Sequence, residues 1–389
     1  MNKNITPDIR YIGVDDPEMK LFESQYITPD GMCYNSYLIS DEKVAIMDTT
    51  DSRTIATWKE NLVEALNGRQ PDYLIIHHLE PDHASGIAEV ATMFPSLTMV
   101  CSAKAAQMMP QYFEDAQLQS RLQTVKEGDT LCLGRHTLHF VMAPMVHWPE
   151  VMVTYDDADR VLFSADGFGK FGTYEADADD WACEARRYYF NICGKYGQPV
   201  STLLRKAEAL DIQKILPLHG PVLEGEQLSE ALRLYSIWSS YGVETEGVFI
   251  AHASIHGNTA AAAQKLVEIL KAKGCPKVAV SDLCRDDLGE AIEDAFRYGR
   301  MVCMASSYDA GVFPPMYDFI HHLDIKAFQR RRVALVENGS WAPSAAKTMR
   351  PMFEAMKQVD VIEPVVTLRG RMKDSDIPQL EALAAALLQ

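Results

Sequence analysis

None of the eight cysteines is followed by another cysteine three positions later, so the chain contains no C-x-x-C pair. Zinc ribbons, rubredoxin-type iron centres and ferredoxin clusters take their thiolate ligands from such pairs, and the sequence argues against all three. Cysteines of a cytosolic protein stay reduced, so we expect these eight to be free thiols, mostly buried.

Long apolar runs and basic residues are also scarce. No apolar stretch is long enough to cross a bilayer, and the start of the chain, Met1-Asn2-Lys3-Asn4-Ile5, lacks the apolar core of a signal peptide. We therefore expect a cytoplasmic protein that does not enter a membrane. Only 37 Lys and Arg residues stand against 54 Asp and Glu, a net charge of −17. Binding to a phosphate backbone needs clustered cations, so nucleic acid is not an expected partner. A local patch could still dock a small redox protein.

Length and composition predict two domains. A chain of 389 residues, 47% of them hydrophobic, is typical of two domains with full cores. A new pattern of strand, turn and helix begins near residue 247. We therefore expect one domain over residues 1–245 and a second over residues 246–389.

Four potential metal ligands lie within six residues, in the segment His78-Leu79-Glu80-Pro81-Asp82-His83. The apolar run Tyr73-Leu74-Ile75-Ile76 before it is typical of a buried strand, so the ligands would lie in the loop where that strand ends. The spacing His-x-Glu-x-Asp-His resembles the signature of the metallo-β-lactamase fold, whose zinc hydrolases usually have a histidine as second ligand. Here that ligand is Glu80, and the carboxylate moves the expected preference from zinc towards iron or manganese.

Three more candidate ligands follow apolar runs farther along the chain, each in a polar or glycine-containing turn. The full candidate set is His78, Glu80, Asp82, His83, His147, Asp166 and His219. Four imidazoles and three carboxylates suit two metal ions with three terminal ligands each and one bridging carboxylate. For any single residue, an ordinary polar loop position is the alternative interpretation.

The second domain begins with a predicted strand, Gly247-Val248-Phe249-Ile250-Ala251, followed by a polar loop and a predicted helix over residues 260–272. The loop, Ser254-Ile255-His256-Gly257-Asn258-Thr259, offers hydroxyls and backbone N–H groups at a helix N-terminus, which is typical of an anion site. It contains neither the Gly-Lys-Ser/Thr of an NTP-binding loop nor G-x-G-x-x-G. A phosphate held without lysine suits a phosphate monoester such as that of FMN. A plain strand-turn-helix is the alternative.

Further strands and helices alternate through this domain, which predicts a doubly wound parallel sheet. Ligands bind such sheets at the carboxyl ends of the strands. Two more polar loops lie at predicted strand ends, and their aromatic residues could stack on a flavin ring. The candidate FMN-binding residues are Ser254, His256, Gly257, Asn258, Thr259, Ser306, Ser307, Tyr308, Asp309, Asn338, Gly339, Ser340 and Trp341.

These motifs, in this order, resemble the flavodiiron proteins over nearly the whole chain. The matching segments are Tyr34-Asn35-Ser36-Tyr37-Leu38-Ile39, the His-x-Glu-x-Asp-His signature, His147-Trp148-Pro149-Glu150, Ala165-Asp166-Gly167-Phe168-Gly169, Glu184-Ala185-Arg186-Arg187-Tyr188-Tyr189, His219-Gly220-Pro221, Gly257-Asn258-Thr259 and Gly311-Val312-Phe313-Pro314-Pro315. The chain departs from the family at His256 and in residues 338–343, where many members have a serine-tyrosine-glycine-tryptophan run.

The resemblance implies a metallo-β-lactamase-like αββα sandwich followed by a flavodoxin-like domain. One non-haem iron would take His78, Glu80 and His147. The other would take Asp82, His83 and His219, with Asp166 bridging the two. Such a protein reduces O₂ to water, NO to N₂O, or both, and FMN relays the electrons. A head-to-tail homodimer, or a dimer of dimers, would bring the flavin of one subunit to the irons of another.

The electron donor would be a separate partner, because we expect no fused rubredoxin or flavin reductase module in a chain that stops at Gln389. Rubredoxin, a flavin reductase and reduced deazaflavin all remain open as the electron donor. So does the choice between O₂ and NO, which should depend on residues around the ligands, with Tyr26, His77, Trp148 and Phe168 as candidates. Two rival functions are a dinuclear zinc hydrolase with an accessory flavodoxin-like domain and a pure electron carrier.

Overall fold

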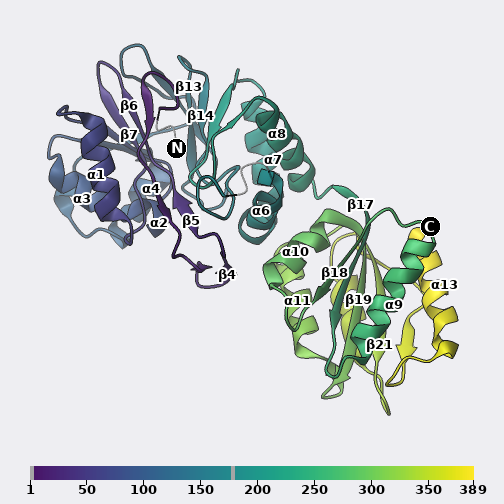
Figure 1. Cartoon of the computed structure of the whole chain (residues 1–389). Helices are drawn as coiled ribbons and strands as arrows, with labels where there is room; N and C mark the ends of the chain where they lie inside the picture. The colour runs from purple at the N-terminus through teal and green to yellow at the C-terminus, as the bar shows by residue number, and fades with distance from the viewer. Residues whose placement is uncertain (1–3, 177–179) are drawn as a thin grey trace. The chain divides into compact units, whose positions relative to one another are not determined.

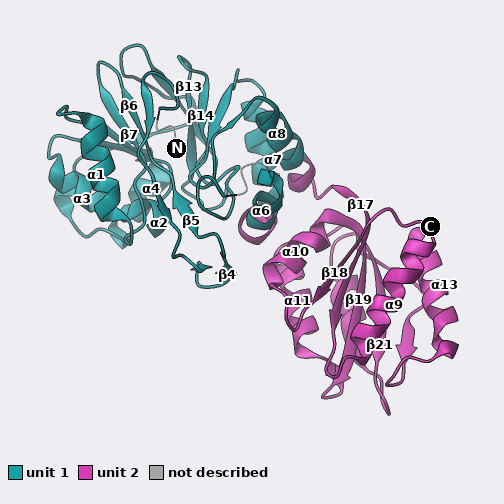
Figure 2. Ribbon diagram, in the orientation of Figure 1, with its two compact units in different colours: residues 1–189, 196–236 teal, residues 190–195, 237–389 magenta. Residues whose placement is uncertain are grey.

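The computed structural model describes residues 4–176 and 180–389, which form two compact units (Figure 2). Unit 1 extends to Tyr189 and also includes Tyr196–Ser236, whereas unit 2 comprises Phe190–Lys195 and Ile237–Gln389. The division between the units therefore lies after Ser236, and a boundary after residue 245 stays a prediction. In the described part of the chain, no helix is long and apolar enough to cross a membrane.

Unit 1 contains two six-stranded sheets. The first runs in the order β1 (Ile9–Tyr11), β6 (Tyr37–Ser40), β7 (Val44–Met47), β8 (Tyr73–Ile76), β9 (Thr98–Ser102) and β10 (Leu122–Val125). The second runs in the order β11 (Thr130–Cys132), β12 (Thr137–Met142), β13 (Met152–Asp156), β14 (Val161–Phe163), β15 (Lys214–Leu216) and β16 (Leu223–Glu224). The other strands described in this unit form two short antiparallel pairs. These are β2 (Val14–Asp16) with β5 (Met32–Tyr34) and β3 (Leu21–Phe22) with β4 (Tyr26–Ile27).

The alternation of side chains along the strands places one core between the sheets and another beneath helices. On β8, Ile75 belongs to the core that unites both sheets, whereas Leu74 and Ile76 face the helices of the first sheet. The helices α1 (Ile55–Leu66) and α3 (Ile87–Met93) cover the first sheet, and α6 (Trp181–Tyr188), α7 (Gly197–Ala207) and α8 (Gly225–Ser239) lie over the second (Figure 1). Unit 1 is thus an αββα sandwich, which confirms the predicted architecture.

Strand directions bring distant loops to one edge of the second sheet. Strand β13 is antiparallel to both β12 and β14, so β12 and β14 run the same way, and β15 is parallel to β14. The loops that follow β12, β14 and β15 therefore leave the sheet at the same edge. These are the loops that carry His147, Asp166 and His219.

Unit 2 is a parallel sheet with helices on both faces. Its strands run in the order β18 (Val278–Asp282), β17 (Thr245–Ala253), β19 (Tyr298–Tyr308), β21 (Arg332–Asn338) and β22 (Asp360–Val361), with β23 (Val366–Leu368) also pairing with β21 and the short β20 (Gly311–Val312) with β19. The helices α9 (Asn258–Ala272) and α13 (Ile377–Leu388) pack together over one face. The helices α10 (Leu288–Arg297) and α11 (Pro314–Ile325) lie over the other, and α12 (Ala345–Glu354) packs against α11 (Figure 1).

If the sheet strands are numbered along the chain with β17 as 1 and β18 as 2, the order across the sheet is 2-1-3-4-5, which is the flavodoxin-like order. The prediction of a doubly wound parallel sheet is confirmed. The polar loops after β17, β19 and β21 all leave the sheet at its carboxyl edge, where the order reverses and ligands bind. All eight cysteines are free, and five of them are buried; Cys132 and Cys284 are exposed.

Candidate metal centre

The loop after β8 begins the site. His78 follows the last strand residue by two positions and is fully buried, and Glu80 precedes Pro81, which opens the single-turn helix α2 (Pro81–Ala84). Proline is favoured at the first helical position because its missing N–H has no partner to lose there. That turn of helix carries the other two ligands of the motif, Asp82 and His83, into the interior.

The side chain of Asn35 fixes both ends of the loop after β15. Asn35 donates two hydrogen bonds from Nδ2, to the carbonyls of Pro217 (2.8 Å) and Gly220 (2.7 Å). Gly220 has φ +86°, and a Cβ there would lie 2.6 Å from Cγ of Lys170, so only glycine suits this turn. His219 lies between these anchors, and its Nδ1 donates to the carbonyl of Cys33 at 2.7 Å. This bond orients the ring so that Nε2 points to the ligand cluster.

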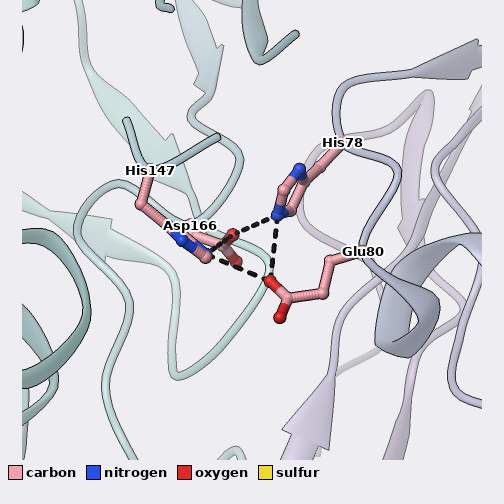
Figure 3. Close-up of side chains that lie close together, drawn as sticks. All are labelled: His78, Glu80, His147 and Asp166. Atoms are coloured by element: carbon pink, nitrogen blue, oxygen red, sulfur yellow. Dashed lines mark hydrogen bonds and ion pairs between the residues drawn. The ribbon is translucent and has the colours of Figure 1, made fainter. Parts of the chain in front are cut away.

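Four of the candidate ligands converge in one group (Figure 3). Nε2 of His78 lies 3.1 Å from Oε2 of Glu80 and 3.2 Å from Oδ2 of Asp166. Nε2 of His147 lies at the same two distances from the same two oxygens. Two imidazole nitrogens and two carboxylate oxygens thus surround one point.

The other three candidates form a second group, Asp82, His83 and His219, and all three are buried. Oδ2 of Asp82 lies 3.3 Å from Nε2 of His83 and 3.2 Å from Nε2 of His219, and the two nitrogens are 3.1 Å apart. The structure therefore brings together all seven residues that the sequence singled out.

Asp166 belongs to both groups. Its Oδ2 faces His78 and His147 at 3.2 Å, and its Oδ1 lies 3.6 Å from Nε2 of both His83 and His219. One carboxylate oxygen towards each group is the arrangement of a ligand shared by two cations.

The unpaired oxygens test whether metal ions suit this cluster. Within the described residues, neither oxygen of Asp82 and neither oxygen of Asp166 has a hydrogen-bond partner, although all four atoms are buried. Buried carboxylates normally have a donor or a cation as partner. The donor set fits two metal ions, and mixed imidazole and carboxylate ligands favour iron or manganese over zinc.

The charges of the cluster support the same conclusion. Burial alone would raise the pKa of Asp166, but the imidazoles of His147 and His78 hold that pKa far below its usual range. Burial also opposes ionisation of Glu80, and hydrogen bonds from His147 and His78 nevertheless lower its pKa to about 2. Both carboxylates are therefore anionic at neutral pH, as metal ligands must be.

In unit 2, three loops meet at the carboxyl edge of the sheet. Oγ1 of Thr259 lies 3.1 Å from Oγ of Ser306, and Nδ2 of Asn338 lies 3.4 Å from the same Oγ1. Gly257 has φ +84° and is the N-cap residue immediately before the fifteen-residue helix α9. Ser254 is only 4% exposed, and its hydroxyl has no hydrogen-bond partner in the described part of the chain. An anion at this helix N-terminus would supply an acceptor for that hydroxyl.

Comparisons with known proteins agree with both units. A family model described as ODP family beta lactamase matches residues 32–220. An uncharacterized protein of Methanocaldococcus jannaschii is 26% identical over 95% of this chain and 93% of its own. The anaerobic nitric oxide reductase flavorubredoxin of Escherichia coli is 28% identical over 87% of this chain and 72% of its own.

Two solved structures match over almost the whole length. The flavodiiron protein from Giardia intestinalis has a TM-score of 0.93 at 21% identity and covers 100% of this chain and 97% of that chain. Rubredoxin oxygen:oxidoreductase from Desulfovibrio gigas has a TM-score of 0.91 at 22% identity and covers 99% and 97%. These matches together support a flavodiiron protein. The relatives indicate an oxidoreductase, and the predicted fold is confirmed.

The candidate metal centre also has supporting residues that we did not single out from the sequence. Oε1 of Glu150 accepts hydrogen bonds from Nδ1 of His78 (2.8 Å) and from the backbone N–H of Leu79 (3.0 Å). The ring of Phe22 packs edge-on against His219, with centroids 5.5 Å apart. Glu150 stands in the motif His147-Trp148-Pro149-Glu150, but no local pattern tells which histidine it contacts.

The four candidates for residues around the ligands have different surroundings. Trp148 packs edge-on against His78, with ring centroids 5.0 Å apart. His77 instead hydrogen-bonds Asp48 through Nδ1 and Thr154 through Nε2, so it points away from the ligand cluster. Tyr26 packs against Phe171, and Phe168 stacks on Tyr235.

We expect Glu150→Gln to weaken metal binding about 10–100-fold, the usual cost of losing the hydrogen-bond partner that orients a metal-binding histidine. Glutamine keeps the shape and an acceptor oxygen for His78 and Leu79 but removes the charge that raises the basicity of the imidazole. The measurement is metal content after dialysis against graded chelator. Glu127→Gln is the control, because Glu127 is half-exposed and pairs with Lys206. Equal metal retention in both variants would contradict this role.

A third cluster of histidine and carboxylates has a different character. His136, Asp156 and Asp159 lie close together, but the guanidinium of Arg135 donates to Asp159 at 2.7 Å. The hydroxyl of Thr6 also donates to Asp159. Arg135 thus already supplies the cation, and we interpret the cluster as an ion-paired contact with the N-terminal segment.

The flavin loops differ in detail from the expectation. Oγ of Ser307 accepts hydrogen bonds from the N–H groups of Ser344 (2.8 Å) and Ala345 (3.2 Å), so it serves the start of α12. Asn338 is buried and exchanges two hydrogen bonds with Gly370. By contrast, Trp341 is 90% exposed and Tyr308 is 45% exposed, so both rings are accessible to a ligand.

Proposed function

We propose that this flavodiiron protein reduces O₂ to water, NO to N₂O, or both, at a non-haem diiron centre, with electrons relayed by FMN. The observation that carries the proposal is Asp166, whose two oxygens face two separate groups of imidazole and carboxylate ligands. A shared carboxylate between such groups suits a pair of metal ions that act together on one small substrate.

His78, Glu80 and His147 would hold one iron, and Asp82, His83 and His219 the other, with Asp166 bridging. When bound there, two ferrous ions would supply electrons and Lewis acidity for the reduction of the gas. The protein contributes orientation and exclusion of water. Glu150 and the carbonyl of Cys33 orient two of the imidazoles, and burial of the histidines keeps the centre largely dry.

FMN would lie at the carboxyl edge of the unit 2 sheet. Ser254 and Thr259 would hydrogen-bond its phosphate at the N-terminus of α9, and Tyr308 or Trp341 would stack on the ring. The candidate residues His256, Gly257, Asn258, Ser306, Asp309, Gly339 and Ser340 line the same loops. When bound, FMN accepts electrons from a donor and passes them on.

The donor would be a separate redox partner, a rubredoxin, a flavin reductase or reduced deazaflavin. The names of the relatives, flavorubredoxin and rubredoxin oxygen:oxidoreductase, favour a rubredoxin-type donor. We also propose a head-to-tail homodimer, alone or paired into a dimer of dimers. The metal ligands belong to unit 1 and the flavin loops to unit 2, so a second copy of the chain can bring one pair of cofactors together.

A dinuclear zinc hydrolase is the alternative function. Its fold and most of its ligands would be the same, but Glu80 replaces the histidine that zinc hydrolases usually have at this position. The observation that separates the two is the metal and flavin content of the purified protein.

The experiment that tests the proposal is anaerobic stopped-flow of the reduced holoenzyme against O₂ and then NO, after metal and flavin analysis of the same sample. We expect two irons and one FMN per chain, and rapid reoxidation of the flavin by at least one gas. Two zincs with no flavin would establish the hydrolase instead. Flavin that stays reduced in both gases would leave only an electron carrier.

A further inference from the structure

The phosphate loop of unit 2 contains no cation. Residues 254–259 provide hydroxyls, backbone N–H groups and the N-terminus of α9, but neither lysine nor arginine. A phosphate monoester carries a charge of about −1.5 to −2 at pH 7. Hydrogen bonds and a helix dipole of about half a charge balance only part of it. Cationic side chains of another segment at the same edge of the sheet would balance the rest.

A second loop at the same edge of the sheet is rich in cations. The segment Arg369-Gly370-Arg371-Met372-Lys373, here called the arginine loop, follows strand β23. Strand β23 is parallel to β21, with Leu368 paired to Asn338, so the arginine loop leaves the sheet beside the third flavin loop. It leads into α13, which packs against α9.

One amide ties the arginine loop to the phosphate loop. The N–H of Gly370 donates to Oδ1 of Asn338, and Nδ2 of Asn338 donates to the carbonyl of Gly370, both at 2.9 Å. The same Nδ2 lies 3.4 Å from Oγ1 of Thr259, in the first turn of α9. Nζ of Lys373 folds back towards the carbonyls of Arg369 and Arg371, which closes the turn. The backbone of Gly370, which lies between Arg369 and Arg371, is therefore linked through Asn338 to the first turn of α9, where the phosphate is expected.

Among the residues that the structure describes, the two arginines have no anionic partner. Both are exposed, and neither guanidinium takes part in a hydrogen bond or ion pair in the described part of the chain. Other arginines of unit 2 do have carboxylate partners: Arg285 with Asp282, Arg300 with Glu246, Arg332 with Asp360, and Arg350 with Glu363.

We infer that Arg369 and Arg371 bind the FMN phosphate and supply the countercharge that the phosphate loop lacks. The inference rests on the proposed function, because it presupposes FMN at this edge. A second, independent indication of a ligand is the hydroxyl of Ser254, which is buried in the phosphate loop without a partner. Guanidinium and phosphate match well, since the planar fork of N–H donors pairs with two phosphate oxygens at once.

The test compares FMN with riboflavin, which has the same ring and ribityl chain but no phosphate. The full chain is depleted of flavin and titrated with each ligand, with flavin fluorescence as readout, at low and high salt. We expect Arg369→Gln and Arg371→Gln each to weaken FMN binding about tenfold, and the double variant up to about a hundredfold, as for hydrogen bonds to a charged group. Riboflavin affinity should stay unchanged, and the loss for FMN should shrink at high salt.

Two further variants serve as references. Arg332→Gln is the matched control, because Arg332 begins β21 at the opposite edge of the sheet and pairs with Asp360. It should leave both affinities unchanged. Thr259→Ala should weaken FMN binding about tenfold to a hundredfold through loss of a hydroxyl bond to the phosphate, again without effect on riboflavin.

Three results would overturn the inference. Unchanged FMN affinity in the double variant, with a loss in Thr259→Ala, would leave FMN in place but exclude the arginines from the phosphate. Equal weakening for FMN and riboflavin would show that the arginines only shape the loop. Unchanged FMN affinity with slower reduction by an acidic donor protein would make the arginine loop a docking surface instead. If the unaltered chain binds neither flavin, the proposed function fails first.

Discussion

Asp166→Ala is expected to release both irons and to lower gas reduction more than about 100-fold. The reason is the position of its carboxylate, with Oδ2 towards His78 and His147 and Oδ1 towards His83 and His219. Removing it deprives both groups of a ligand at once. Loss of a residue that only hydrogen-bonds a metal ligand typically lowers metal affinity or activity about 10–100-fold, so loss of a shared ligand should cost more. Elemental analysis of the purified chain, with circular dichroism to verify folding, measures the effect.

Two further variants test whether Asp166 is shared by both groups. His219→Ala should mainly empty one position and leave about one iron per chain, because His219 belongs to a single group. Asp157→Ala should retain both irons, since Asp157 is a half-exposed carboxylate beside His139. Asp166→Ala protein that keeps one iron firmly bound would refute the shared position. Two zincs in active, unaltered enzyme would refute iron as the metal.

Protein stripped of FMN is expected to keep both irons and to lose steady-state turnover. All seven candidate ligands lie in unit 1, so removal of a flavin from unit 2 leaves the metal groups complete. Chemically reduced irons should still react once with O₂ or NO. Repeated turnover should fail, because electrons from the external donor have no route to the irons. A gas electrode with the donor, and a single-turnover assay without it, give the two rates. Turnover at the normal rate without flavin would rule out FMN as the relay.

Co-expression of two complementary variants tests the head-to-tail dimer. His83→Ala removes a metal ligand but leaves the flavin loops intact, whereas Ser254→Ala combined with Thr259→Ala weakens FMN and leaves the metal ligands intact. Each homodimer should be inactive. A mixed dimer should regain up to about half the normal activity, because the flavin of one subunit then faces the irons of the other. Mixed dimers without activity would show that the two cofactors act within one chain.

Part of the candidate site could be predicted because it depends on local patterns. The apolar run before His78 is a strand, and Pro81 opens the helical turn that carries Asp82 and His83, as their order in the chain indicates. The ligands after β12, β14 and β15 could be proposed for the same reason, since each lies in a turn where an apolar run ends. Alternation of strands and helices likewise predicted the parallel sheet of unit 2.

Pairings between distant segments could not be predicted in this way. The order Ser307, Tyr308, Asp309 suggests a flavin loop. Only the fold shows that the Ser307 hydroxyl accepts hydrogen bonds from backbone N–H groups at the start of α12. No pattern around Glu150 reveals that it orients His78, and none around Arg369 reveals that an amide from β21 anchors its loop near Thr259.

The sequence by itself determined which residues can act: the seven candidate ligands, the cation-free phosphate loop, and the strand ends that carry them. These follow from residue chemistry and from periodicity over a few neighbours, which act along the chain. Only the tertiary structure decided that the two oxygens of Asp166 face different groups and that Asn338 links Gly370 to Thr259. Those relations depend on strand direction, sheet order and packing. In the metal centre they join residues that are up to more than a hundred positions apart in the chain, and such long-range geometry leaves no local signal in the sequence.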